Sequence, residues 1–309
     1  MMRTRLWATT ALALGVLLSG CQKKTEGGGG PAASTTASTA GEKAPRVHCP
    51  ARLQTAARPA GAPVDDVVGV RPGLTYDEAA NLVQCEDKSL DVKPTTTGFD
   101  IESYGQRLRQ GFDAKPREPE MTSQEILKKM HDDAAARGAN RVVDALKPGQ
   151  QLFYVSTIGP PDQDRVVGVW REQWFEEGRN PPLETVRKAL TDKYGPPTLD
   201  QNGEIYWLHD AMGRPLDRDS PLTGNCLGRV RATSNGFSLN PDCGLTVAAR
   251  IVPLKTNPDL ARSLELGIAD QAKGYAAIEA TEKALAAADA QRRAKEVQRA
   301  NQNADAPKL

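Results

Sequence analysis

The stretch LTVAARIVPLKTNPDLARSLELGIAD, residues 245–270, decides the fold class. Apolar and polar residues alternate through much of it, which is typical of β-strands that bury one face. The first half aligns four apolar residues on one side of a strand, and the second half aligns three: Leu245, Val247, Ala249 and Ile251, then Leu264, Leu266 and Ile268. The linking KTNPD has the residue types of a turn. We therefore expect two antiparallel strands here.

The chain upstream combines short β-rich runs with amphipathic helices. Residues 64–85, VDDVVGVRPGLTYDEAANLVQC, predict a strand, a turn and a helix that Thr75 and Glu78 cap reciprocally. A strand is expected near 89–95, and residues 97–121 are expected to be irregular. Together with the predicted strands at 245–270, these segments indicate an α+β fold with an antiparallel sheet or sheets and helices packed on one face.

Further elements follow the same logic. Thr122 and Glu125 predict a second capping box and helix. A hairpin around a Pro-containing loop is predicted by QLFYVSTIG and RVVGVWREQWF. A helix is expected after Pro182, and another strand is predicted by GEIYWLHD. Residues 214–225 are expected to form a loop.

A long C-terminal helix is predicted from Asp270 to Asn301, because this stretch is rich in alanine. Tyr275, Ile278 and Leu285 are expected to dock on the β-rich section. Beyond Leu285 the sequence offers almost no large apolar side chain. We expect a helix that is docked at its start and free at its end.

The N-terminus has the pattern of an export signal. Arg3 and Arg5 precede an apolar run from Leu6 to Leu18, which is shorter than the ~20 residues that a membrane-spanning helix needs. The run ends in Leu18-Ser19-Gly20-Cys21, which resembles the lipobox of bacterial lipoproteins. The resemblance implies cleavage before Cys21, attachment of lipid to that cysteine, and anchoring in a membrane. Gln22, in place of an aspartate, favours the periplasmic face of the outer membrane.

Composition then divides the chain into five parts. Residues 1–20 are the expected signal peptide, and 21–45, rich in Gly, Ala, Ser and Thr, are expected to form a flexible, disordered tether. An N-terminal α+β unit is expected at 46–150 and a β-rich α+β unit at 151–269. Residues 270–309 form the expected helix and tail.

The remaining four cysteines predict two disulfides, as in other exported proteins. We favour Cys49–Cys85 and Cys226–Cys243, because each pair closes a local loop. A zinc site is the alternative, but the spacing contains no C-x-x-C and no nearby pair of histidines.

Charge and motifs exclude several functions. With 40 Lys and Arg against 39 Asp and Glu, the chain lacks the basic excess of an electrostatic nucleic-acid binder. It has no G-x-S-x-G, H-E-x-x-H or phosphate-binding glycine loop. The best remaining group is His209, Asp210, Asp217 and Asp219, which could meet around a metal or form a solvated acidic loop. We expect no catalytic residue, metal or cofactor.

Aromatic residues between 153 and 207 offer one candidate binding surface. Trp170 and Trp174 have the same parity, so a regular strand places both on one side. They could form a surface that binds a ligand or a partner, because Trp and Tyr are enriched at interfaces, or they could form core.

A segment near the middle resembles a known group of lipoproteins. NPPLETVRKALTDKYGPPTLDQNGEIYW, with Val186, Leu190, Gly195, Pro196 and Trp207, is similar to the helix, Gly-Pro and tryptophan-bearing strand of small outer-membrane-assembly lipoproteins of the SmpA/BamE type. The β-lactamase-inhibitor fold is built from similar units. The resemblance implies a fold and a compartment, and no functional residue.

We therefore expect a non-enzymatic, lipid-anchored envelope protein that binds or scaffolds an envelope protein. A periplasmic inhibitor of a hydrolase such as lysozyme or a protease is the alternative, with Gly213–Asn225 as the presented loop. An unrecognised enzyme is a third hypothesis.

Overall fold

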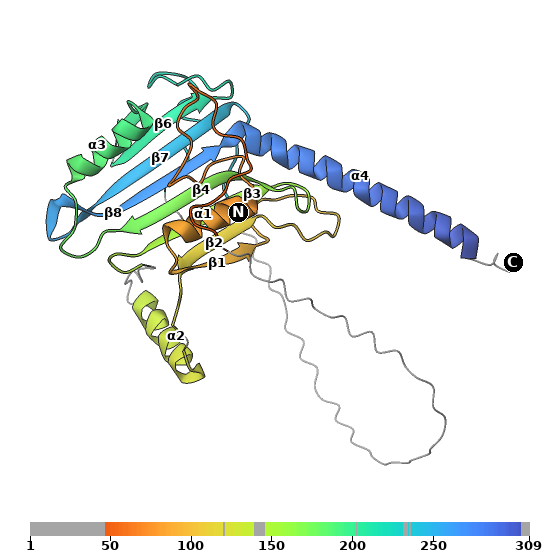
Figure 1. Cartoon of the computed structure of the whole chain (residues 1–309), viewed down its shortest axis with the longest axis horizontal. Coiled ribbons are helices and arrows are strands. Elements are labelled where there is room, and N and C mark those ends of the chain that lie inside the picture. The colour runs from red at the N-terminus through yellow and green to blue at the C-terminus, as the bar shows by residue number, and fades with distance from the viewer. Residues whose placement is uncertain are drawn as a thin grey trace, which may run out of the picture. The chain divides into compact units, whose positions relative to one another are not determined.

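Eight antiparallel strands form one sheet, in the order β1-β2-β3-β4-β8-β7-β6-β5 (Figure 1). The structure is a computed structural model, and it describes residues 47–119, 121–138, 146–201, 203–230, 234 and 236–303. The expected signal peptide, Cys21 and the tether lie outside the described residues. Within the described part, the α+β class with an antiparallel sheet and a long C-terminal helix is confirmed.

The strands are β1 (Leu90–Thr95), β2 (Gly111–Pro116), β3 (Gln151–Ile158), β4 (Arg165–Trp174), β5 (Leu199–Gln201), β6 (Glu204–Asp210), β7 (Cys243–Leu254) and β8 (Asn257–Asp270). The helices are α1 (Tyr76–Glu86), α2 (Ser123–Gly138), α3 (Leu183–Tyr194) and α4 (Gln271–Asn303).

Two similar units build the sheet. In the first, α1 precedes the meander β1 to β4, and in the second, α3 precedes the meander β5 to β8. The last strands of the two meanders, β4 and β8, pair with each other, and Val169 lies opposite Ile268. Residues from both expected units, 46–150 and 151–269, therefore share one sheet, and residues 45–309 form one compact unit rather than two.

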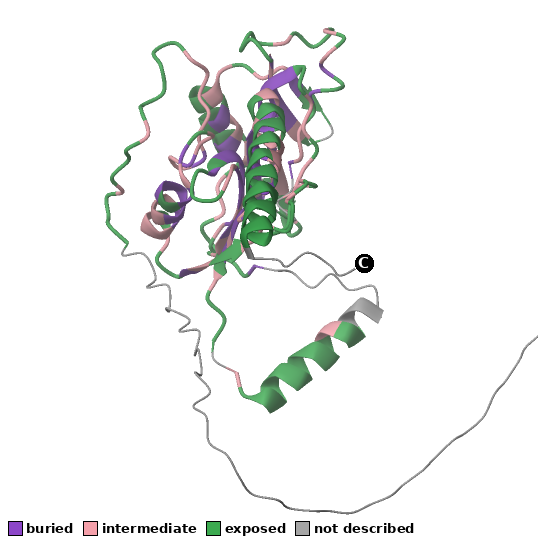
Figure 2. Cartoon of the chain, turned by 90° about the vertical axis from the view of Figure 1, so that its right-hand side faces the viewer, coloured by how far each residue is buried: buried purple, intermediate pink, exposed green. Residues whose placement is uncertain are grey.

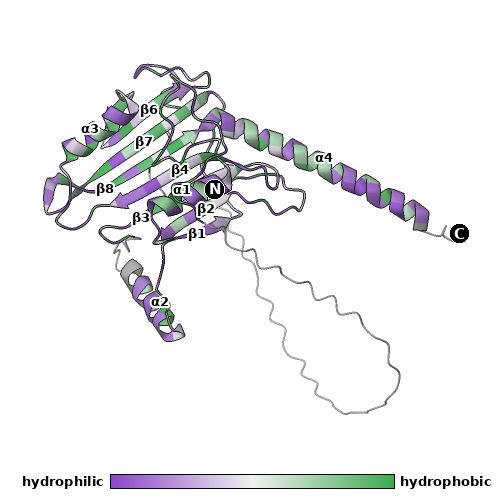
Figure 3. Cartoon of the chain, in the orientation of Figure 1, coloured by the Kyte–Doolittle hydropathy of each residue, from purple (hydrophilic) through white to green (hydrophobic). Residues whose placement is uncertain are grey.

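The register of β7 and β8 confirms the predicted faces. Val247 lies opposite Ile268 and Ala249 lies opposite Leu266, so the alternating apolar residues all point to one side. α1 and α3 cover this side, and their buried residues belong to the same core cluster as the strand residues: Ala79, Val83, Val186, Leu190, Val155, Val169, Val247 and Ile268. Figure 3 shows the apolar residues along these strands.

Two local predictions were wrong. Val67 and Val70 form only a single bridge around a tight turn, because Val68 and Gly69 both adopt positive φ angles of 45° and 87°. β2 lies inside the segment that was expected to be irregular. Its Asp113, Lys115 and Pro116 hide the strand pattern, and only Phe112 and Ala114 point into the core.

α4 follows β8 without a loop and is 33 residues long, which corresponds to about 50 Å. Gln271, Thr281, Leu285 and Asp289 are buried along one stripe, whereas every side chain described after Asp289 is exposed (Figure 2). Leu285 docks as predicted. Tyr275 does not, because it is 38% exposed.

Candidate functional site

The second face of the sheet is covered by chain without regular helices. The described residues between β6 and β7, 211–230, 234 and 236–242, cross this face, and Leu216, Leu222 and Val230 pack against Tyr206 and Leu208. The face carries a row of cross-strand neighbours: Tyr154, Trp170, Gly267, Ala248 and Tyr206. The two small residues, Gly267 and Ala248, are neighbours between Trp170 and Tyr206, which leaves space between the sheet and the covering chain.

Two strand glycines determine how Trp170 lies on this face. A Cβ at Gly267 would be 2.4 Å from Cδ1 of Trp170, and a Cβ at Gly168 would be 2.6 Å from its Cη2. The indole therefore lies close to the backbone of both strands. Its Nε1 donates a hydrogen bond of 2.9 Å to the carbonyl of Arg229, which ties the covering chain to the sheet.

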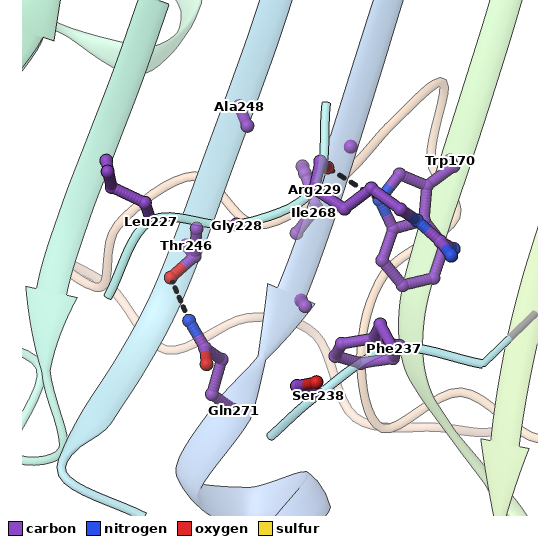
Figure 4. A pocket seen from close by; sticks show the side chains of 12 residues that line it. Trp170, Leu227, Gly228, Arg229, Phe237, Ser238, Thr246, Ala248, Ile268 and Gln271 are labelled. Carbon is purple, nitrogen blue, oxygen red and sulfur yellow. Dashed lines mark hydrogen bonds between the residues drawn. The ribbon is translucent and has the colours of Figure 1, made fainter. Parts of the chain in front are cut away.

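Between the covering chain and the sheet lies a cavity of about 390 Å³. Trp170 and Phe237 form its aromatic end, Ala248 lies on its floor, and Leu227 belongs to its roof (Figure 4). Ala269 also lines it. Phe237 meets Trp170 edge-on, with ring centroids 4.6 Å apart. The volume and the mixed lining are typical of a small-ligand site.

The polar groups around this cavity bond mostly to one another. Nε2 of Gln271 donates to Oγ1 of Thr246 at 2.8 Å and to the carbonyl of Cys226 at 3.2 Å. Oε1 of Gln271 accepts from the amide of Asn240. Oγ1 of Thr246 also donates to the Cys226 carbonyl. Because these partners are already engaged, a ligand would be held mainly by apolar and aromatic contact.

A cation lies over the aromatic end. The guanidinium of Arg229 is 4.4 Å from the centre of the Trp170 ring, within the range of a cation–π interaction. It also donates to the carbonyl of Gly236 and to the hydroxyl of Ser234. Burial lowers the pKa of Arg229, although the nearby Tyr154 opposes the shift. Arg229 therefore fixes the covering chain above Trp170.

Neither tryptophan forms an exposed partner-binding surface of the kind considered from the sequence. Both point to the same side, as predicted, but Trp170 is 1% and Trp174 is 9% exposed. Nε1 of Trp174 donates to Glu172 at 2.8 Å, and the guanidinium of Arg262 covers its ring at 4.5 Å. Trp170 belongs to the cavity wall and Trp174 to the core beside it.

The disulfides are the two that were predicted. Cys226 pairs with Cys243, and both are fully buried beside the cavity. Cys49 pairs with Cys85 and ties the segment before α1 to that helix. The Cys226–Cys243 bridge fixes the covering chain at the point where it enters the cavity roof, which Leu227 and Gly228 form.

The group around His209 does not assemble into a metal site. Nδ1 of His209 lies 3.1 Å from the carbonyl of Leu245, and burial lowers the pKa of the ring. Asp210 stabilises the turn that follows it, whereas Asp217 and Asp219 are exposed. Among the described residues, no group of three or more His, Cys, Asp or Glu could hold a metal ion.

Two glycines in the sequence are signals for the cavity. Gly168 and Gly267 interrupt otherwise regular strand patterns, and a lone strand glycine indicates close approach of another group.

None of the helices in the described residues has the length and apolar character needed to span a bilayer.

Comparison with known proteins gives no relative for this chain, because no family model, curated protein or solved structure matches it. In the unit around α3, Nε1 of Trp207 donates to the carbonyl of Gly195 at 2.8 Å, and Tyr194 packs against the Trp207 ring. Membership of the SmpA/BamE group stays a prediction.

Proposed function

We propose that this chain is an exported, lipid-anchored protein of the bacterial cell envelope that acts by binding and not by catalysis. Leu18-Ser19-Gly20-Cys21 at the end of an apolar run is the observation that carries the proposal. Cys21 is the lipid-bearing residue, and the protein faces the periplasm from the outer membrane. Two disulfides support an oxidising compartment.

The cavity beside Trp170 is the proposed binding site. Its aromatic and aliphatic lining and its internally bonded polar groups favour a small ligand that is mostly apolar, with one or two polar atoms. The hydroxyls of Thr246 and Ser238 are the side-chain hydroxyls of the lining, and such atoms would reach these groups. The ligand could also be a side chain of an envelope protein. The partner protein predicted from the sequence would then bind by inserting that side chain into the cavity.

The anchor is tested by replacing Cys21 with serine in cells fed labelled fatty acid. The unaltered chain should incorporate the label and sediment with membranes, and Cys21→Ser should do neither. Replacing Ser19 with alanine, a small residue, is the matched control and should retain both. Labelling of the Cys21→Ser chain would contradict the proposal.

The cavity is tested with 1-naphthol, a fused aromatic ring with one hydroxyl, added to the purified full chain while tryptophan fluorescence is recorded. Ala248→Leu fills the floor and Thr246→Val removes the hydroxyl, and each should weaken saturable binding at least fivefold. Ala280→Leu adds the same side chain at an exposed position of α4 and should not change it. Unchanged binding in both cavity variants would reject the site.

A second candidate function, inhibition of a periplasmic hydrolase, is favoured by one turn. Asp210 accepts hydrogen bonds from the amides of Met212 and Arg214, each at 2.9 Å, and pairs with the Arg214 guanidinium at 2.7 Å. Met212 at the tip is 79% exposed. A rigid turn that presents one apolar side chain suits insertion into a protein cleft. Inhibition of a purified lysozyme or protease that Met212→Glu abolishes and Met130→Glu preserves would support this candidate.

A further inference from the structure

A second cavity lies on the same face of the sheet, at its β1 edge. It measures about 470 Å³ and is lined from β1 to β3 and by the covering chain. Tyr154, which lies opposite Trp170 in the sheet, contributes to this second cavity, whereas Trp170 contributes to the first. Arg229 binds Ser234 and Gly236, which line the second cavity from above. The two cavities are therefore neighbours with different linings.

The charges in the second cavity cancel within it. Nζ of Lys115 lies 2.8 Å from the carboxylate of Asp113, and these two are the charged side chains of the lining. Burial alone would lower the pKa of Lys115, but hydrogen bonds with Asp113 and Tyr154 raise it, so the ammonium of Lys115 stays protonated. A paired site with no net charge gives little attraction to a phosphate or a carboxylate, and it still offers strong donors and acceptors to a neutral polar ligand.

The other groups of the lining are hydroxyls and an aromatic ring. Thr95, Thr97, Ser234 and Tyr154 contribute hydroxyls. Oγ1 of Thr95 donates to the carbonyl of Thr97 and accepts from the Thr97 amide, and Oγ of Ser234 accepts from Arg229, so a ligand would use the remaining donor and acceptor positions of these groups. Lys115 lies 4.8 Å from the centre of the Tyr154 ring and holds the ring and the ion pair in one arrangement. A wall of this kind matches a ligand whose surface is itself made of hydroxyl groups and C–H bonds.

At the rim of the second cavity, the covering chain packs closely against the loop that follows β1. A Cβ on Gly236 would be 1.9 Å from the carbonyl oxygen of Gly98, so the covering chain and the loop after β1 touch through their backbones. Phe99 and Phe237 pack beside this contact, with ring centroids 5.4 Å apart. The cavity rim is thus built from two segments that lock together.

We propose that the cavity formed by Asp113, Lys115, Tyr154 and the Thr95 and Thr97 hydroxyls binds a short neutral saccharide. The paired Asp113 and Lys115 would form hydrogen bonds with adjacent sugar hydroxyls, and Tyr154 would lie against the C–H face of one ring. This site is independent of the lipid anchor and of the cavity beside Trp170. The envelope that we propose as the location of the protein is a source of such sugars.

The test uses isothermal titration of the purified full chain with chitotriose and cellotriose, and with inorganic phosphate as the charged alternative. We expect saturable binding of a trisaccharide and none of phosphate. The double variant Asp113→Asn with Lys115→Met keeps the net charge and should weaken saccharide binding at least tenfold. Thr97→Val, at an exposed position where misfolding is not expected, should weaken it about threefold.

The matched control is Lys188→Met with Asp192→Asn, which removes an ion pair of 2.7 Å from α3 on the opposite face and should leave binding unchanged. Equal loss in the control and the Asp113/Lys115 variant, binding of phosphate in place of saccharide, or absence of any saccharide binding would each overturn the proposal. Fatty-acid labelling at Cys21 and naphthol binding would be unaffected by that failure, so the two proposals are separable.

Discussion

Gly267 shows how one residue shapes the cavity beside Trp170. Replacing it with alanine would place a Cβ 2.7 Å from the carbonyl oxygen of Arg229 and 2.5 Å from Nε1 of Trp170. The ring and the covering chain would have to move, and we expect a loss of about 2 kcal/mol in the free energy of unfolding. Gly224→Ala is the control, because a Cβ there meets nothing within 4 Å. Urea denaturation that finds equal stability for both variants would contradict this packing.

A second residue, Glu78, links stability to pH. The residue is 8% exposed, and its carboxylate accepts hydrogen bonds from the amides of Gln54, Thr55 and Thr75 and from the Thr55 hydroxyl. Burial alone would raise its pKa, but the bonds from Thr55, Thr75 and Gln54 lower it from 4.5 to about 2. The capping box predicted from the sequence is thus also the anchor for the segment before α1.

Because the pKa of Glu78 is lower in the folded chain, the ionised form stabilises the fold. That contribution is complete above about pH 4.5 and is lost as the pH falls towards 2. Glu78→Gln should cost about 1–3 kcal/mol at pH 7 and should flatten the decline in stability over this window. Glu184→Gln, at a side chain that is 87% exposed, should behave like the unaltered chain. A decline of equal steepness in Glu78→Gln would argue against this role.

At the scale of elements, the covering chain between β6 and β7 depends on its disulfide. The bridge Cys226–Cys243 spans 17 residues, and removing it should cost about 3 kcal/mol by the loop-entropy relation. The double variant Cys226→Ala with Cys243→Ala should also weaken naphthol binding, since Leu227 and Gly228 form the roof of the cavity. Both effects can be measured by urea denaturation and by fluorescence titration.

The other bridge supplies the comparison. Cys49–Cys85 spans 36 residues and lies away from the cavity. Cys49→Ala with Cys85→Ala should lower stability by a similar amount, about 3–4 kcal/mol, and should leave naphthol binding intact. If both double variants lost naphthol binding, the loss would reflect general unfolding. That result would contradict a specific role of Cys226–Cys243 in holding the cavity roof.

At the scale of the whole molecule, α4 divides into a docked half and an exposed half. Thr281 and Leu285 are 1% and 2% exposed, whereas every side chain described after Asp289 is exposed (Figure 2). Figure 3 shows that the exposed half is predominantly hydrophilic. Its length therefore adds surface and little buried apolar area.

Deleting residues 290–309 should therefore change the melting temperature by less than about 2 °C. Leu285→Ala, in the docked half, should cost about 2–5 kcal/mol and lower the melting temperature clearly. Scanning calorimetry of the two variants measures the difference. A large drop on deletion would mean that the end of α4 is part of the core.

Local patterns in the sequence were enough to predict most elements. The alternation at 245–270, the capping residues Thr75 and Glu78 and the alanine-rich C-terminal segment each act over a few residues, so they can be read without knowing the fold. The two disulfide pairs were predictable for the same reason, because each closes a local loop. β2 was missed because its inward face holds few apolar residues between polar ones.

The tertiary structure alone decided that β4 pairs with β8, which joins the two units into one sheet. It also decided that Trp170 lies over Gly267 beneath the covering chain, and that Asp113, Lys115 and Tyr154 meet at a second cavity. Residues 170 and 267 are far apart in sequence, and their contact depends on which strands bury their faces together. That choice minimises the free energy of the whole chain, so no local pattern of residues encodes it.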